Sequence, residues 1–111
     1  MAKALGINIV TVNEWLREKY GSTGNNLYEA IQNTNAYADV YAPTSIYSRY
    51  VFEDIPTGLI PLFCLGKKLG VDTPIAKAVI DWATALYSFD FLGRSRNETK
   101  MDLDAIIRSI G

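Results

Sequence analysis

The residues best suited to chemistry lie close together in one segment, residues 48–56. It holds a cation, Arg49, followed by an aromatic ring, Tyr50, and two adjacent carboxylates, Glu53 and Asp54. A planar guanidinium binds a carboxylate through two parallel hydrogen bonds, and a carboxylate can orient a neighbouring base. We therefore predict that this segment forms part of a binding or catalytic site.

Each of these residues also has an ordinary structural interpretation. Arg49 and Glu53 are four residues apart, so on a helix they can form an exposed ion pair worth only a few tenths of a kcal/mol. Asp54 can cap the segment that enters the following proline, and Tyr50 can be a core aromatic. The residue types alone leave both interpretations open at each position.

A long apolar segment, residues 59–69, follows this candidate site and should hold it still by burying itself. Pro56 lies shortly before this segment and Pro61 lies within it. Because a residue before proline disfavours the α conformation, we expect a helix over residues 48–54 that ends near Ile55, and a second helix over residues 61–69. A single kinked helix that begins at Asp54 is the alternative.

The remaining sequence predicts further short helices and no strand. Thr11, with Glu14 three residues later, has the form of a capping box, and Thr73 followed by Pro74 is a strong helix start. The expected helices occupy residues 1–6, 12–20, 27–33, 74–88 and 103–110, the last capped by Asp102, with an irregular connection over 34–46 and a second capping-box pattern from Ser95 to Glu98. We therefore predict an all-α fold, a compact bundle of five or six short helices in a single domain that spans residues 1–111.

The spacing of the apolar residues predicts which faces are buried. We expect an inward face on the helix after Thr11, another on the longest helix, and packing by the irregular connection. The members of these three sets are Val12, Trp15, Leu16 and Tyr20; Ile75, Ala78, Val79, Trp82, Ala83 and Leu86; and Tyr37, Val40 and Tyr41. Cys64 lies in an apolar run, where we expect a small buried side chain rather than a nucleophile.

Composition and charge exclude several classes of protein. A hydrophobic fraction of 49% and a charged fraction of 21% are typical of a folded globular domain. The net charge is -1 and the longest basic run is Lys67-Lys68, so no surface for nucleic acid is evident. The longest apolar stretch is well short of the roughly 20 residues that a membrane span needs. With no secretory leader and a single cysteine, we expect a cytoplasmic setting.

Two absences narrow the chemistry further. The sequence has no histidine, which excludes histidine-based triads and histidine metal ligands within this chain. It also has no GxGxxG or GxxxxGK[ST] pattern, and its glycines are scattered. The usual cradle for a dinucleotide or a phosphate is therefore missing.

Several motifs together resemble a known family. They are the run Arg49-Tyr50-x-x-Glu53-Asp54-x-Pro56, then Gly58-Leu59-Ile60-Pro61 and Gly70-Val71-x-Thr73-Pro74, with Glu14-Trp15-Leu16 and Leu27-Tyr28-Glu29-Ala30-Ile31 upstream. At these positions, and over nearly all of its length, the chain resembles the C-terminal all-helical domain of the NAD(P)-dependent opine dehydrogenases, such as the octopine and nopaline enzymes. The resemblance implies a fold like that of the C-terminal domain of 6-phosphogluconate dehydrogenase.

The resemblance also implies an activity and roles for the site residues. Opine dehydrogenases condense an amino acid with a 2-oxo acid and reduce the imine with NAD(P)H. By resemblance, Arg49 binds a substrate carboxylate with help from Glu53 and Tyr50, and Asp54 orients a catalytic histidine. That histidine and the Rossmann domain for the cofactor belong to parts of the complete enzymes that are not matched here. We therefore expect no bound cofactor and no activity from this chain alone, a Rossmann domain as partner, and a homo-oligomer.

The alternative function is of a different kind. Because the histidine and the cofactor loop are missing, the chain can also be a free-standing helical module for oligomerisation or binding, with no catalytic activity.

Overall fold

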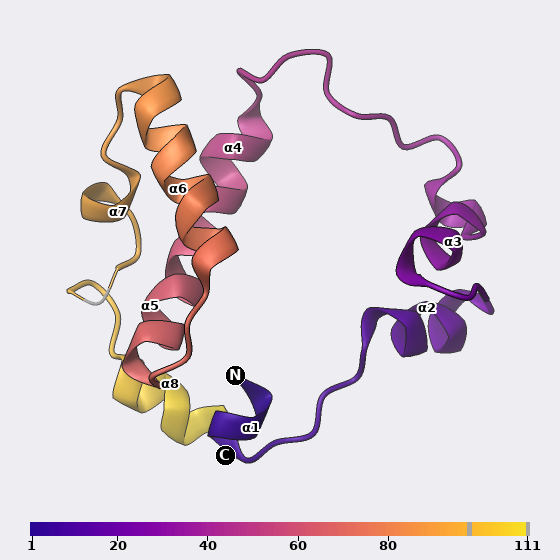
Figure 1. Ribbon diagram of the computed structural model, residues 1–111, viewed down its shortest axis with the longest axis horizontal. Coiled ribbons are helices and arrows are strands. Elements are labelled where there is room, and N and C mark those ends of the chain that lie inside the picture. Colours follow the sequence, from indigo (N-terminus) through magenta and orange to yellow (C-terminus); the bar gives the residue numbers. More distant parts are fainter. Residues whose placement is uncertain (98, 111) are drawn as a thin grey trace. The chain divides into compact units, whose positions relative to one another are not determined.

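The computed structural model describes residues 1–97 and 99–110, and every regular element among these residues is helical. The elements, labelled in Figure 1 where there is room, are α1 (Ala2–Leu5), α2 (Val12–Tyr20), α3 (Leu27–Gln32), η1 (Asn35–Tyr37), α4 (Arg49–Asp54), η2 (Ile55–Leu59), α5 (Ile60–Lys68), α6 (Pro74–Tyr87), α7 (Phe91–Arg94) and α8 (Leu103–Ile110). The prediction of an all-α fold is confirmed. None of the helices in these residues is long and apolar enough to cross a membrane.

The contacts divide the chain into two compact units. The larger unit comprises Met1–Ile7 and Ser45–Gly111, and the smaller unit comprises Asn8–Thr44. Each unit is described by itself below. The interpretation of residues 1–111 as a single domain stays a prediction.

The smaller unit begins with the predicted capping box. The main-chain N–H of Thr11 donates to Glu14 Oε2 at 2.7 Å, and the N–H of Glu14 donates to Thr11 Oγ1 at 3.2 Å. Gly21 ends α2 in the left-handed conformation, with φ of 66°. A side chain also caps the start of α3: Asn26 Oδ1 accepts from the N–H of Glu29 at 2.9 Å. The local sequence signals therefore set both ends of α2 and the start of α3.

The predicted burial in this unit is mostly wrong. Of the expected inward face of α2, only Leu16 is buried. The unit has only two short helices and a single 3₁₀ turn, too little structure to enclose more than a few side chains. Five other members of the two apolar sets predicted for this unit are exposed: Val12, Trp15, Tyr20, Val40 and Tyr41.

The capping box gives a testable pH effect. Hydrogen bonds from the N–H and hydroxyl of Thr11 stabilise the Glu14 carboxylate, so its pKa lies below the ordinary value of 4.5. A lowered pKa in the folded state means that α2 gains stability above the ordinary pKa and loses it as the pH falls through the folded value. NMR titration of the Glu14 carboxyl carbon should show this low pKa. In Thr11→Ala, which keeps the N–H but loses the hydroxyl, the pKa should rise part of the way back; an unchanged value would rule out the hydroxyl as a cause.

The larger unit is built on an uninterrupted helical run, α4, η2 and α5, in which the middle element is a π turn (Figure 1). The predicted bounds of the two α-helices agree with the structure to within one residue, since α4 ends at Asp54 and α5 begins at Ile60. The expected break between them is wrong, because Ile55 keeps a helical backbone, with φ of -68° and ψ of -55°. Across the π turn the N–H of Ile60 donates to the carbonyl of Ile55, five residues earlier. The wider turn accommodates the prolines, which lack the N–H groups that a regular α-helix would use.

The π turn also aligns the buried residues. Residues five apart come close to the same side of a π turn, whereas in an α-helix they would be about 140° apart around the axis. Ile55 and Ile60 are both buried, and Cys64 follows Ile60 one α turn later, also buried as predicted. These three belong to the core of the larger unit, whose buried members are Ile55, Ile60, Cys64, Ile80, Ala83, Phe91 and Leu103.

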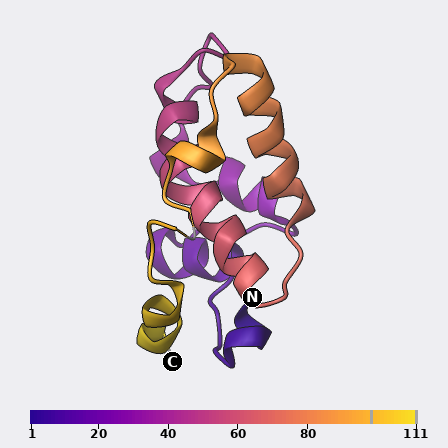
Figure 2. The ribbon, with the colours of Figure 1, turned by 90° about the vertical axis from the view of Figure 1, so that its left-hand side faces the viewer.

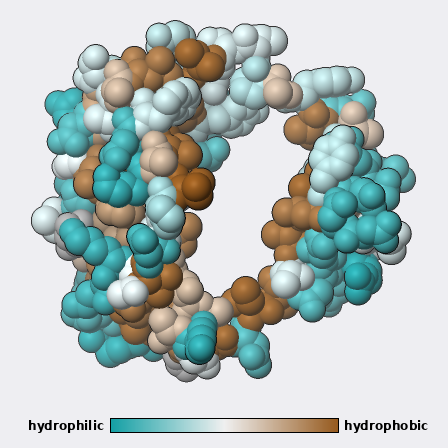
Figure 3. All heavy atoms as spheres, in the orientation of Figure 1, coloured by the Kyte–Doolittle hydropathy of each residue, from teal (hydrophilic) through white to brown (hydrophobic). Residues whose placement is uncertain are grey.

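Helix α6 packs beside α5, and α7 packs against α6 (Figure 2). Its bounds agree with the prediction, and Ser88 ends it with φ of 49°. The predicted buried face is largely wrong: of its members only Ala83 is buried, and the helix turns it toward the core together with Ile80, which the prediction did not include. Ile75 and Trp82 of the predicted face are 76% and 49% exposed, and hydrophobic residues reach the surface of this unit in Figure 3.

The chain ends with α8, which Asp102 caps as predicted: its Oδ1 accepts from the N–H of Ala105 at 2.9 Å. Lys68 of α5 and Asp104 of α8 form an ion pair at 3.2 Å, which joins these two helices. The predicted capping box from Ser95 depends on Glu98, which lies outside the described residues.

Candidate functional site

All four predicted site residues lie on α4, and the helical spacing places them on one side of it. Successive residues of an α-helix differ by about 100° around the axis, so positions 49, 50, 53 and 54 fall within one half of the circumference. Val51 and Ile55 occupy the other half and pack in the core. The sequence therefore folds so that Arg49, Tyr50, Glu53 and Asp54 share the solvent face of α4, and all four are exposed. We call these four residues the α4 face.

Arg49 interacts with an aromatic ring and not with a carboxylate. Its guanidinium carbon lies 5.5 Å from the centre of the Tyr50 ring, within range of a cation–π contact. Among the described residues, no ion pair joins Arg49 to Glu53, so the alternative interpretation of these two as an exposed pair is wrong. Tyr50 is 48% exposed and is not a core aromatic. The Tyr50 ring can hold the guanidinium in place while leaving its N–H groups to a ligand.

The two carboxylates stand at the end of α4. Asp54 has a helical backbone, with φ of -74° and ψ of -35°, and its side chain makes no capping hydrogen bond. The interpretation of Asp54 as an N-cap is therefore wrong. Glu53 is exposed, and its main-chain carbonyl accepts a hydrogen bond from the hydroxyl of Thr57 in the π turn. Both carboxylates are thus available to groups outside the helix.

An aromatic cluster packs against the core side of α4. Phe52, on the edge between the α4 face and the core, packs edge-on against Tyr87 at 4.7 Å between ring centres and in a tilted arrangement against Phe91 at 5.4 Å. Tyr87 also packs against Tyr47 at 5.3 Å, and its hydroxyl donates to the carbonyl of Ile46 at 2.6 Å. The last turn of α6 therefore fixes the segment that leads into α4.

Sequence reasoning missed Tyr87. The apolar spacing of α6 pointed to a face centred on Ile75, Val79 and Trp82, and Tyr87 does not belong to that set. The available signal was the density of aromatic residues at the end of α6 and just after it, because aromatic rings at such spacing tend to pack together.

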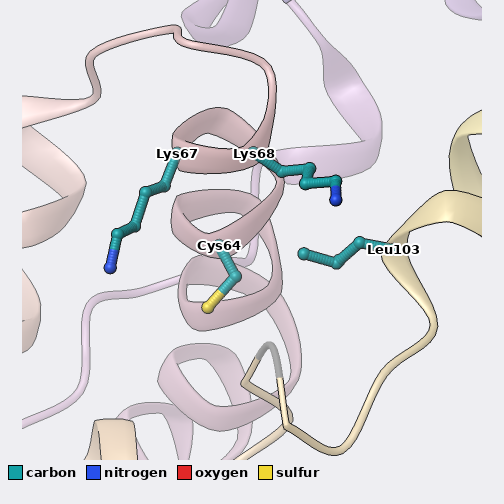
Figure 4. Close-up of a pocket in the computed structure, with 4 residues that line it drawn as sticks. All are labelled: Cys64, Lys67, Lys68 and Leu103. Carbon is teal, nitrogen blue, oxygen red and sulfur yellow. The ribbon is translucent and has the colours of Figure 1, made fainter.

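A separate cavity of about 400 Å³ lies between α5 and α8 (Figure 4). It is lined by Cys64, Lys67, Lys68 and Leu103, and the two lysine side chains point in different directions from the last turn of α5. Lys68 is paired with Asp104. Of the described residues that line this cavity, none belongs to the α4 face.

The α4 face offers one cation and two carboxylates on a fixed helix. The guanidinium suits a carboxylate ligand, and a carboxylate at Asp54 suits a cation or the N–H of a base supplied from outside. The face is a convex helix surface, so it supplies one wall of a site. Within the described residues, no group of three or more histidine, cysteine, aspartate or glutamate side chains is placed to hold a metal ion.

Comparison with known proteins matches the chain to a family. The family model described as "NAD/NADP octopine/nopaline dehydrogenase, alpha-helical domain" matches residues 1–87. The sequence is 39% identical over 106 residues to "Opine dehydrogenase" of Arthrobacter sp. (strain 1C), an alignment that covers 96% of this chain and 30% of that protein.

More distant relatives give the same result. The chain is 25% identical over 115 residues to "Protein ocs" of Agrobacterium tumefaciens (strain Ach5), covering 99% of this chain and 32% of that protein. It is 27% identical over 100 residues to "Vitopine synthase" of Allorhizobium ampelinum, covering 90% of this chain and 28% of that protein. The chain therefore spans about a third or less of the length of these relatives.

Proposed function

The chain belongs to the octopine/nopaline dehydrogenase family, whose α-helical domain it matches, and on this basis we propose that it is the substrate-binding domain of an opine dehydrogenase. The complete protein would condense an amino acid with a 2-oxo acid and reduce the resulting imine to a secondary amine. In this proposal Arg49 binds a substrate carboxylate, with Tyr50 and Glu53 beside it. Asp54 orients a histidine that another part of the complete protein supplies.

The arrangement of Arg49 is the observation that carries the proposal. Its guanidinium lies over the Tyr50 ring, and in the described part of the chain it has no carboxylate partner. An exposed arginine held by a ring can bind a carboxylate through two hydrogen bonds without first breaking an ion pair. Both substrates of the proposed reaction carry such a carboxylate.

The cofactor of the family is not expected to bind to these residues. A dinucleotide cradle needs a glycine turn before a helix, where main-chain N–H groups point toward the phosphates. The glycines with positive φ among the described residues are Gly6, Gly21 and Gly70, and each follows a helix instead. At such ends it is carbonyl oxygens that point outward, which repel phosphate. We therefore propose that NAD(P) is held by a further domain.

Two measurements test this function. When the chain is joined to a dinucleotide-binding domain, NAD(P)H should be oxidised only if an amino acid and a 2-oxo acid are both present; oxidation with neither or with one would contradict the proposed reaction. Isothermal titration of NADH into the chain alone should give no specific heat of binding. Micromolar affinity would show that our account of the missing cofactor site is wrong.

A helical module for self-association is the second candidate, and the exposed apolar side of α6 favours it. Ile75, Val79 and Trp82 fall on one side of this helix, about 100° from the buried side, while its charged residues Lys77 and Asp81 pair with each other on a third side at 2.6 Å. A helix that is apolar over more than half of its circumference usually has a second partner. A second copy of the chain can supply that surface.

The α6 side predicts concentration-dependent association. In sedimentation velocity the chain should form dimers at micromolar concentration, and Trp82→Gln should shift the equilibrium toward monomer by about tenfold, because it removes a large apolar side chain from the contact. Lys77→Gln, on the charged side of the same helix, should leave the equilibrium unchanged. If the wild-type chain stays monomeric at all concentrations, self-association through α6 is excluded.

A further inference from the structure

The segment that leads into α4 is contacted by Tyr87, the last residue of α6. The Tyr87 hydroxyl donates to the carbonyl of Ile46 at 2.6 Å, and the two residues are 41 positions apart in the sequence. The Tyr87 ring packs edge-on against Tyr47 and Phe52, on either side of the start of α4. Tyr87 therefore contacts the chain both before and after Arg49.

The start of α4 has little else to fix it. Ser48 occupies the N-cap position, but its side chain makes no capping hydrogen bond. The N–H of Val51 donates to the carbonyl of Ser48 at 3.2 Å, which closes only the first turn. A helix start without a side-chain cap frays readily, since its first N–H groups lack partners. The orientation of Arg49, the first residue of α4, thus depends on how firmly the preceding segment is held.

We infer that Tyr87 is a positioning residue for the α4 face: its hydroxyl fixes the entry to α4 and thereby the direction of the Arg49 guanidinium. The inference rests on the proposed function for its effect on substrate, but the fixing of α4 is a property of the chain itself. Among the described residues, the hydrogen-bond and ring partners of Tyr87 are Ile46, Tyr47, Phe52 and Phe91, and Arg49 is not one of them. The effect of Tyr87 is carried by Ile46 and Tyr47 and by the packing of Phe52.

Tyr87→Phe is the sharpest test, because it removes the hydroxyl and keeps the ring. In the chain itself, amide hydrogen exchange at Val51 and Phe52 should become about three- to tenfold faster, the range expected for the loss of one hydrogen bond. Exchange at Ile80, in the middle of α6, should not change. Tyr28→Phe is the matched control, since Tyr28 is exposed on α3 in the smaller unit.

The effect on substrate is measured in the chain joined to a dinucleotide-binding domain. Tyr87→Phe should raise the KM for the 2-oxo acid about three- to tenfold with a smaller change in kcat. If Tyr87 acts through Arg49, the same substitution should have no further effect on KM in an Arg49→Lys background. A purely structural role would lower the thermal midpoint but give independent, additive effects on KM.

The outcomes separate the two proposals. If exchange at Val51 and Phe52 is unchanged in Tyr87→Phe, or if its effect on KM adds fully to that of Arg49→Lys, the positioning role is wrong. If Arg49→Lys itself leaves KM unchanged, the proposed function fails, while the exchange measurement still decides whether Tyr87 fixes α4.

Discussion

Replacing Arg49 by lysine should raise the KM for the 2-oxo acid at least about tenfold in a protein that joins this chain to a dinucleotide-binding domain, with a smaller effect on kcat. The guanidinium presents a planar pair of N–H donors to a carboxylate, whereas an ammonium offers one charge without that geometry. Lysine also stacks less well on the Tyr50 ring, which lies 5.5 Å from the guanidinium in the structure. Steady-state kinetics with varied 2-oxo acid measures the change.

Arg108→Lys serves as the control for this prediction. Arg108 is exposed on α8, away from the α4 face, and the same chemical change there should leave both kinetic constants within error of the wild type. An equal rise in KM for both variants would mean that exchanging any exposed arginine for lysine lowers substrate affinity, and that the α4 face has no special role. An unchanged KM for Arg49→Lys would remove Arg49 from the substrate site.

Replacing Phe91 by alanine should lower the free energy of unfolding of the larger unit by about 3 to 5 kcal/mol, the cost of emptying a large aromatic site in a core. Phe91 is 0% exposed and packs against the rings of Phe89, Phe52 and Tyr87 at distances of 4.9 to 6.1 Å. Because Phe52 stands behind the α4 face, the loss should also loosen α4. Urea denaturation followed by far-UV circular dichroism gives the energy.

Leu92, the next residue, provides the comparison. It is 37% exposed, so Leu92→Ala should cost about 1 kcal/mol or less. Equal costs for the two variants would show that the aromatic cluster does not form the centre of the core. A normal stability for Phe91→Ala would contradict the structure directly.

The ends of most helices were predictable from sequence because they depend on neighbouring residues. The capping box at Thr11, the cap at Asn26, the proline start of α6 and the cap at Asp102 are each satisfied within a few positions. Local hydrogen bonds of this kind do not depend on what the helix packs against. The same holds for the α4 face, since helical spacing alone brings its four residues to one side.

Burial was much less predictable. Apolar spacing identifies an apolar stripe, but α6 has two such stripes, and only the packing against α5 decides that Ile80 and Ala83 face inward. Trp82 and Ile75 were assigned to the wrong side for this reason. The anchoring of α4 by Tyr87 was also beyond sequence reasoning, since it joins residues 41 positions apart.

The π turn was missed because the rule for residues before proline is a preference and not a prohibition. Ile55 adopts the α conformation that the rule disfavours, while its side chain is buried in the core. Burial of Ile55 and Ile60 on one side of the helical run offsets the conformational cost of placing Ile55, the residue before Pro56, in the α conformation.

A π turn contains one residue more than the α-helical turn it replaces, so the stretch from Ile55 to Ile60 works as a spacer of set length. Deleting Gly58 would restore α-helical spacing and rotate α4 by about 100° relative to α5, which would carry Arg49 and Asp54 toward a different direction with every motif residue still in the sequence. Two sequences with the same Arg-Tyr and Glu-Asp pairs but one residue more or fewer before α5 would therefore aim the arginine differently. In this chain the count of residues in the helix is as much a determinant of the site as their identity.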